Sequence, residues 1–463
     1  MDPGRRTTGT DANGVSDRAE FKRRPGWTLP APLAPYGRTL GTTAGLVAAT
    51  VLNSGTGFVF WWIAARQFPA AAVGLAGAAV SAMLLLSQIA MLGLGTQLVG
   101  VLHRESRATS LAITALIAAG TAASLLALAF GLLAPAFFPE LAGLADSPLT
   151  LALFVAGVSL TTLGSMLDQV LVALFRNVYQ LLRNAVFSFG RLVLLVAAAA
   201  VFGSAGSVIF GAWVVGVLVS LITILVLAHA SRLTHDVRPL MFRPLAAMTR
   251  GALSHHVLNL SRSSSVWLLP LIVTVMLSHA QNASFYVALV LANFVTIVST
   301  SATFTLYVVG ARAPHELWRH LRLTLGIAAG VSMLGALVLT VAGRQLLGAF
   351  GPSYAEAYPT VAILGISCLP MAVKDHWIAI QRVRGAVTSA AVIGVGFLVL
   401  ELVAAGIGAA NGGLIGLAAA RLTVLVAQAA VLAPIVYRWL FPGGTGPAVG
   451  ASADGRPGPV VDG

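Results

Sequence analysis

Charged residues are scarce in this chain of 463 residues: only 9% are Asp, Glu, Lys or Arg, whereas 57% are hydrophobic and the mean hydropathy is +0.89. Soluble globular chains carry about 25% charged residues. A soluble fold could not bury so much apolar surface, but lipid can solvate it. The composition therefore excludes a soluble globular protein and predicts an all-α membrane protein.

Cysteine is almost absent too. The single Cys368 lies in an apolar stretch, so an intrachain disulfide and a cysteine metal cluster are both excluded. A phosphate-binding loop ending in Gly-Lys-Ser/Thr and a His-Glu-x-x-His motif are also missing. We therefore expect no metal and no cofactor, and we expect transport driven by an ion gradient, the membrane potential or the substrate gradient rather than by ATP.

The net charge of +13 would suit a nucleic-acid partner. Here, however, the basic residues gather in short segments between apolar stretches and in the N-terminal tail. That placement favours a role in orienting the chain in a membrane. We expect membrane lipids, and no nucleic acid, as partners.

Apolar stretches of about 20 residues, the length that crosses a bilayer, recur along the chain. The pattern predicts an all-α polytopic membrane protein with about 12 transmembrane helices. The predicted spans are 40–65, 71–102, 108–138, 148–175, 183–203, 205–229, 250–278, 283–311, 319–342, 358–381, 386–407 and 411–437.

The order of the spans predicts two pseudo-symmetric six-helix lobes around a central cavity. The predicted parts are a disordered tail at 1–38, an N-lobe at 39–240, a C-lobe at 241–440 and a second disordered tail at 441–463. The first tail contains no apolar segment that would suit a removable signal peptide.

Charge placement supports this count of spans. Most of the 28 Lys and Arg residues fall in alternate connections, and only Arg66 and Arg344 fall in the others. The positive-inside rule then places both termini in the cytoplasm. We expect the protein in the bacterial cytoplasmic (inner) membrane. Trp61 and Trp62, near the outer end of the first span, suit anchors at the lipid–water interface.

The two halves resemble each other at an offset of about 206 residues, which predicts a parallel repeat about an axis normal to the membrane. Val51-Leu52-Asn53 matches Val257-Leu258-Asn259, for example. Transporters built from such repeats place their site between the halves near mid-membrane.

Arg262 is the strongest candidate for that site. It lies roughly 18 Å from the predicted inner end of its span, near mid-bilayer, and its own span contains no acidic residue. Asn259 and Ser263 share its helix face, and Asn53 and Thr56 are their counterparts in the first span. A cation at this depth either faces a cavity or is locked to a carboxylate. We expect the cavity.

Charges in other spans are candidates for coupling or gating. Asp168 and Lys374 occupy matching positions of the repeat, so they either form a pair between the halves or belong to separate structural pairs. Asp375 follows Lys374, but neighbours on a helix point about 100° apart, so both cannot face one cavity.

Arg191, Glu401 and Arg421 lie in the fifth, eleventh and twelfth spans. Glu401 either provides a proton or cation site or neutralises Arg421. Within the spans, basic residues outnumber acidic ones. A cavity with spare positive charge favours an anionic headgroup such as a phosphate or pyrophosphate.

Three segments resemble a known family. They are "GLAGAAVSAMLLLSQIAMLGLG" (74–95), "FGPSYAEAYPTVAILGISCLP" (350–370) and "GGLIGLAAARLTVLVAQA" (412–429). They are similar to polysaccharide-repeat-unit (oligosaccharide-lipid) flippases of the multidrug/oligosaccharidyl-lipid/polysaccharide exporter superfamily. The resemblance covers residues 40–437.

This resemblance implies two six-helix lobes around a central cavity that is lined by the first and seventh spans, with alternating access. It puts Asn53, Asn259 and Arg262 in the cavity, with Arg262 on the phosphate of a polyprenyl-linked sugar. The sequence departs from two relatives of that superfamily. The lipid II flippases usually have fourteen helices, and the drug extruders often carry an acidic residue in the first span, where this chain has none.

The leading hypothesis is a non-enzymatic flippase for a lipid-linked glycan, with glycosyltransferases or polymerases as partners. The alternative is a cation-coupled multidrug or metabolite extruder that uses Glu401 or Asp375 as its coupling site. A membrane glycosyltransferase, polymerase or ligase ranks third, because such enzymes need a sizeable outer loop and here those connections are short.

Overall fold

The computed structural model describes residues 37–102, 105, 107–174, 176–230, 240–312 and 316–441. The chain divides into Met1–Ala44 and Gly45–Gly463, and every contact below lies within the second unit. The described residues are mostly helical, without strands, and ten of their helices are long and apolar enough to cross a membrane. The chain is therefore a multi-pass membrane protein.

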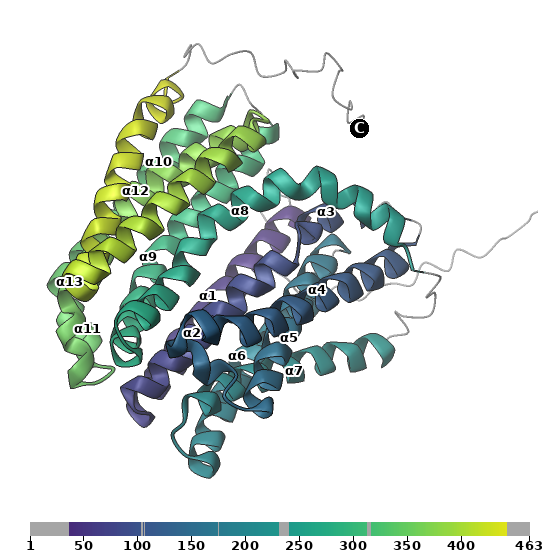
Figure 1. Ribbon diagram of the computed structural model, residues 1–463. Coiled ribbons are helices and arrows are strands. Elements are labelled where there is room, and N and C mark those ends of the chain that lie inside the picture. Colours follow the sequence, from purple (N-terminus) through teal and green to yellow (C-terminus); the bar gives the residue numbers. More distant parts are fainter. Residues whose placement is uncertain are drawn as a thin grey trace, which may run out of the picture. The chain divides into compact units, whose positions relative to one another are not determined.

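The helices follow one another along the chain as Figure 1 shows. Their bounds are α1 Gly37–Gln67, α2 Ala70–Ala90, α3 Leu94–Val101, α4 Ala108–Phe137, η3 Pro139–Leu144, α5 Pro148–Ala173, α6 Asn177–Phe202, α7 Gly206–Ala230, α8 Phe242–Met276, α9 His279–Arg312, α10 Leu317–Val341, α11 Gly343–Gly348, η5 Pro352–Ala357, α12 Tyr358–Val383 and α13 Val387–Arg438.

The last element, α13, contains two of the predicted spans. Its 52 residues would extend about 78 Å as one helix, more than twice the bilayer core. The chain turns at Gly412 and Gly413, where Gly413 has a φ of 58°, a left-handed value that favours glycine. On either side of the turn, the backbones of Gly408 and Gly416 lie in close contact, so the two arms form a hairpin (Figure 1).

The second predicted span is also interrupted. The structure breaks it between α2 and α3, where Leu92 and Gly93 have φ values of 48° and 76°. Glycines at 93 and 95 lower the helix propensity there, which explains why an apolar stretch of sufficient length is not one helix. Counting α2 with α3 as one span and α13 as two confirms the prediction of about 12 spans.

Two groups of helices form the body of the protein. Helices α2, α4, α5, α6 and α7 contact one another, and so do α8, α9, α10, α12 and α13. The predicted lobe boundary at residue 240 falls between α7 and α8. The predicted disordered tails lie almost entirely outside the described residues, although Gly37 and Arg38 already belong to α1.

Successive helices run antiparallel, so alternate connections lie on opposite sides. We call the side with the connections after α3, α5, α9 and α12 the basic side, because it carries Arg107, Arg176 and Arg384. The other side is the far side. Arg322 Nε donates to the Leu440 carbonyl at 2.6 Å on the basic side.

The two groups pack tightly at the far side, where α2 meets α9. The Asn282 amide donates to the Gly74 carbonyl at 2.7 Å, and Gly77 lies beneath the Tyr286 ring. The Trp61 ring lies 4.5 Å from that of Tyr286, and Trp61 is 2% exposed. The prediction that Trp61 anchors the lipid interface is therefore wrong: it helps to close the far side.

Candidate functional site

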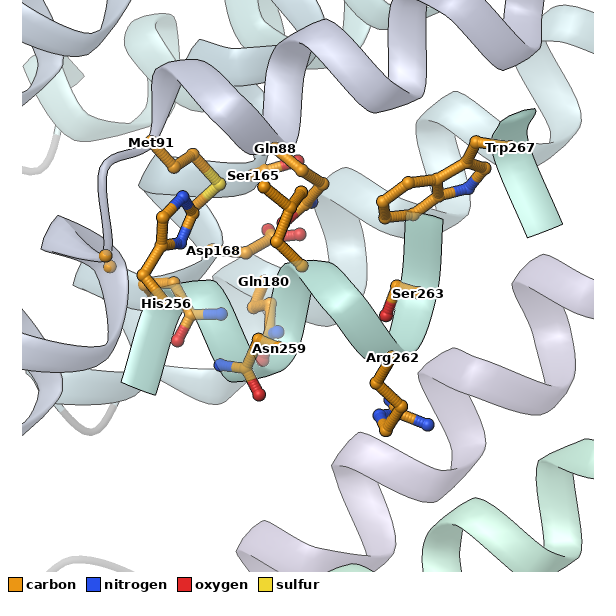
Figure 2. A pocket seen from close by; sticks show the side chains of 14 residues that line it. Gln88, Met91, Ser165, Asp168, Gln180, His256, Asn259, Arg262, Ser263 and Trp267 are labelled. Atoms are coloured by element: carbon orange, nitrogen blue, oxygen red, sulfur yellow. The ribbon is translucent and has the colours of Figure 1, made fainter. Parts of the chain in front are cut away.

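A cavity of about 380 Å³ lies between α2, α3, α5, α6 and α8 (Figure 2). Ligand sites in proteins span roughly 300–1,000 Å³. Its walls are mostly polar. The lining residues are Gln88, Met91, Gly93, Gly95, Ser165, Asp168, Gln169, Gln180, His256, Asn259, Leu260, Arg262, Ser263 and Trp267.

The cavity lies toward the basic side of the bundle. Gln88 and Gln169 are near the basic-side ends of α2 and α5, and Gln180 is in the first turn of α6. The far side is closed by the contact between α2 and α9 described above. The cavity therefore lies nearer to the basic side than to the packed far side.

Arg262 lines this cavity, as the sequence predicted, but it also has an acidic partner. Its Nη1 lies 3.8 Å from Oδ1 of Asp375 on α12, and its side chain is 31% exposed. The expectation that Arg262 is an unneutralised cation is therefore corrected. That expectation considered only acidic residues within the same span, whereas Asp375 lies on another helix. A separation of 3.8 Å is beyond hydrogen-bond range, so the pair is loose and leaves guanidinium donors available. Figure 2 shows the side chain pointing away from Gln88, Ser165 and Asp168.

Asn259 and Ser263 line the same cavity as Arg262. The Asn259 carboxamide oxygen accepts a hydrogen bond from Arg382 of α12, whose guanidinium also lies 5.9 Å from the Tyr307 ring. Spacing along one helix therefore predicted correctly which polar residues of α8 share a wall.

Asn53 and Thr56 lie elsewhere. Neither is among the residues that line this cavity, so their predicted place beside Arg262 stays a prediction. Both instead accept hydrogen bonds from Nη2 of Arg191, at 3.1 Å to the Asn53 carbonyl and 3.3 Å to the Thr56 hydroxyl. The physical reason is that Arg191 of α6 is buried and takes these α1 groups as its partners.

Arg191 is held by aromatic rings. Its guanidinium lies 4.4 Å from the Trp213 ring, 4.5 Å from Phe187 and 5.6 Å from Phe60, and the residue is 1% exposed. Gly216 leaves room for its main chain. Among the residues that the structure describes, Arg191 forms no ion pair within 4.0 Å.

Asp168 and Lys374 do not pair with each other. Asp168 binds Arg183 of α6 and accepts a hydrogen bond from Asn184 at 3.3 Å. Lys374 Nζ lies 2.5 Å from Oε1 of Glu401. The hypothesis of a pair between the halves is wrong, and the alternative of two separate structural pairs is confirmed.

Glu401 is 1% exposed and is shared by two cations. Besides Lys374, Arg421 Nε lies 3.7 Å from its Oε2, to which Ser265 donates at 3.0 Å. This contact confirms the alternative that Glu401 neutralises Arg421.

Lys374 and Asp375 point in different directions, as their helix spacing predicts. Lys374 points to α13 and Asp375 points to α8.

Sequence reasoning missed several polar groups. The cavity is also lined by Gln88, Gln169, Gln180 and Trp267. The only sign of them in the sequence was a polar or amphipathic side chain within an apolar span.

Buried or half-buried cations in the described helices outnumber the acids facing them. The cations are Arg183, Arg191, Arg262, Lys374, Arg382 and Arg421, and the acids are Asp168, Asp375 and Glu401.

No protein-family model and no curated protein matches this chain. Solved structures do match. An inward-facing multidrug resistance MATE family transporter of the MOP superfamily has a TM-score of 0.63 at 15% identity, covering 84% of this chain and 95% of that one. A mutant of the Vibrio cholerae MATE transporter VcmN has a TM-score of 0.60 at 16% identity, covering 87% and 96%.

A third match is a MOP superfamily transporter from Pyrococcus furiosus, whose binding pocket is described as having reversed polarity. Its TM-score is 0.57 at 14% identity, and the match covers 88% of this chain and 95% of that one. At these identities the likeness concerns the fold. The chain has the fold of MATE-like transporters of the MOP superfamily.

Proposed function

We propose that this protein is an exporter that moves a polyprenyl-(pyro)phosphate-linked oligosaccharide across the cytoplasmic membrane by alternating access, for surface or exported polysaccharide. The fold supports transport in general. One observation supports the cargo: Arg262 is part of the cavity wall and is held only loosely by Asp375. Guanidinium groups bind phosphate oxygens well because their planar donors match them in pairs.

The charges of the cavity wall point the same way. Asp168 is the only carboxylate among the lining residues, and Arg183 already binds it. A cationic drug would therefore meet no free carboxylate on this wall, whereas a phosphate would meet Arg262.

From the positive-inside rule we expect the basic side, where α13 ends, to face the cytoplasm. The cavity then opens to the leaflet in which cytoplasmic glycosyltransferases would build such a cargo. A polymerase or transferase on the other side would consume it.

A cation-coupled multidrug extruder is the second candidate, and it is favoured by the drug transporters among the matched structures. Such a mechanism needs an acidic group that can exchange its cation. Glu401 already contacts Lys374 and Arg421, and Asp375 faces Arg262. Either acid would have to release an arginine or lysine before it could take up a proton or sodium ion.

Reconstitution into liposomes separates the two candidates. We expect the wild-type protein to translocate a fluorescent polyprenyl diphosphate-linked disaccharide and not the cation ethidium. Arg262→Ala should lower the rate about 10- to 100-fold, the loss expected for one charge-assisted contact, and Arg262→Lys should restore part of it. Arg319→Ala, at an exposed position, is the matched control. Proton-dependent ethidium export without movement of the glycolipid would establish the extruder instead.

A further inference from the structure

Three carboxamide side chains line the cavity wall. Gln88 of α2, Gln169 of α5 and Gln180 of α6 are half-buried, and within the described part of the chain their side chains form no hydrogen bond. Each carboxamide offers two donors and an acceptor. Half-buried polar groups are normally satisfied by protein or by a ligand or water. We call these three residues the amide wall.

The break between α2 and α3 shapes this wall. A Cβ at Gly95 would lie 2.9 Å from Cγ of Gln169, so a glycine is needed for the backbone to pass so close. Gly93, with its left-handed φ of 76°, ends the turn that brings α3 there. The interrupted helix therefore holds the Gln169 side chain against the cavity without filling it.

Trp267 of α8 supplies an aromatic face to the same cavity. His256, Ser263 and Trp267 are spaced seven and four residues apart, so they lie on one face of α8. Trp267 lines the same cavity as Gln88, and Figure 2 shows Arg262 pointing away from the amides. One part of the cavity is therefore lined by the amide wall and Trp267. The cation Arg262 lies at the edge of the cavity.

We propose that the amide wall and Trp267 form a carbohydrate subsite that binds the neutral sugar rings of the cargo, apart from the phosphate at Arg262. Adjacent sugar hydroxyls each donate and accept, which matches the paired donor and acceptor of a carboxamide. The C–H face of a sugar ring packs on an indole, and its N–H can bond to a hydroxyl. A lipid phosphate alone would not need these groups. The inference rests on the proposed function.

Two probes separate the subsite from the phosphate site: a short polyprenyl diphosphate, and the same lipid carrying a neutral disaccharide. Binding of each to the full-length protein in nanodiscs is measured for the wild type, for the double variant Gln169→Leu/Gln180→Leu and for Trp267→Leu. Gln345→Leu changes a solvent-exposed amide on α11 and is the matched control.

We expect the wild type and the control to prefer the sugar-bearing probe by about tenfold or more, the gain from two or three net hydrogen bonds. The double variant should bind both probes equally, with the wild-type affinity for the sugar-free lipid, which also shows that it is folded. Trp267→Leu should lose part of the preference.

Equal affinity of the wild type for both probes, or a preference that survives in the double variant, would overturn the subsite while leaving a lipid-phosphate carrier intact. A preference that is also lost in Gln345→Leu would equally count against it. If the wild type binds neither probe, the proposed function fails as well.

Discussion

The guanidinium of Arg262 on α8 lies 3.8 Å from the carboxylate of Asp375 on α12, whereas the preceding residue, Lys374, binds Glu401 on α13. Two neighbours on one helix thus engage two different helices, because successive side chains point about 100° apart. Arg382 follows Asp375 by two turns of α12, so it lies on the same helix face and is close enough to both Arg262 and Asp375 to interact electrostatically. Asp375 therefore contacts Arg262 and lies in the electrostatic field of a second arginine, Arg382.

Asp375→Asn tests whether this carboxylate competes with the cargo for Arg262. A partly exposed ion pair contributes up to about 1 kcal/mol, and the probe must break this pair to bind Arg262. Without the pair, we expect the polyprenyl diphosphate probe to bind up to about fivefold more tightly. Transport should slow, since release becomes harder. Binding and liposome translocation measured on the same preparation check both effects.

Glu316→Gln is the control for this change, because it removes a carboxylate from an exposed contact with Arg319 at 4.0 Å. It should alter neither binding nor translocation. Unchanged or weaker binding in Asp375→Asn would mean that the carboxylate orients Arg262 for the phosphate rather than competing with it.

Glu401→Gln should strongly destabilise the protein. Lys374 and Arg421 would then lose the carboxylate that they share in a buried site, and such losses typically cost about 3–5 kcal/mol. Thermal unfolding in detergent should show a clearly lower Tm. Adding Lys374→Met should recover part of the loss by removing one unpaired cation.

The extruder hypothesis predicts the opposite pattern for Glu401→Gln. A coupling carboxylate that is protonated in part of the cycle would tolerate Gln with little loss of Tm, while proton-dependent transport disappears. Tm and proton-dependent transport, measured together, therefore show whether Glu401 stabilises the fold or couples transport to protons.

The sequence predicted the fold because membrane spans are marked by length and hydropathy alone. It even placed the turn between the last two spans at 407–411, beside the observed break at Gly412 and Gly413. It could not predict the break between α2 and α3, since an apolar stretch shows its length but not its backbone geometry.

The site was harder to predict, because it depends on contacts between helices. Asn259, Arg262 and Ser263 share a wall because they share a helix face, which spacing reveals. The hydrogen bond between Asn53 and Arg191 depends on how α1 packs against α6. Spacing along a single helix gives no information about that packing. The predicted span began only at residue 183, whereas α6 begins at Asn177, so Arg183 lies well inside the helix and is buried.

Gly216→Val should destabilise the protein through Arg191. A Cβ at residue 216 would lie 3.0 Å from the Arg191 Cβ and 3.3 Å from its backbone, so α6 and α7 would have to separate. Overpacking of this kind costs about 1–3 kcal/mol. Gly211→Ala on the same helix is the control, because its added Cβ would meet Leu153 at an ordinary 3.8 Å. Denaturant unfolding of both variants should show a loss only for the first, and equal stability would mean that the Arg191 cage is not tightly packed.

Gly74→Val tests alternating access, because it should hold the far side open. A Cβ at Gly74 would overlap the His279 carbonyl, so α2 and α9 could not close as they do here. The only native cysteine is buried, and Cys368→Ala gives a clean background for Ser263→Cys on the cavity wall. In that background an impermeant thiol reagent should label residue 263 from the basic side. Gly74→Val should shift labelling to the far side, whereas Gly330→Val, where nothing lies within 4 Å of the added Cβ, should leave it unchanged. If the sidedness of labelling is the same in all three proteins, the contact between α2 and α9 is not the gate.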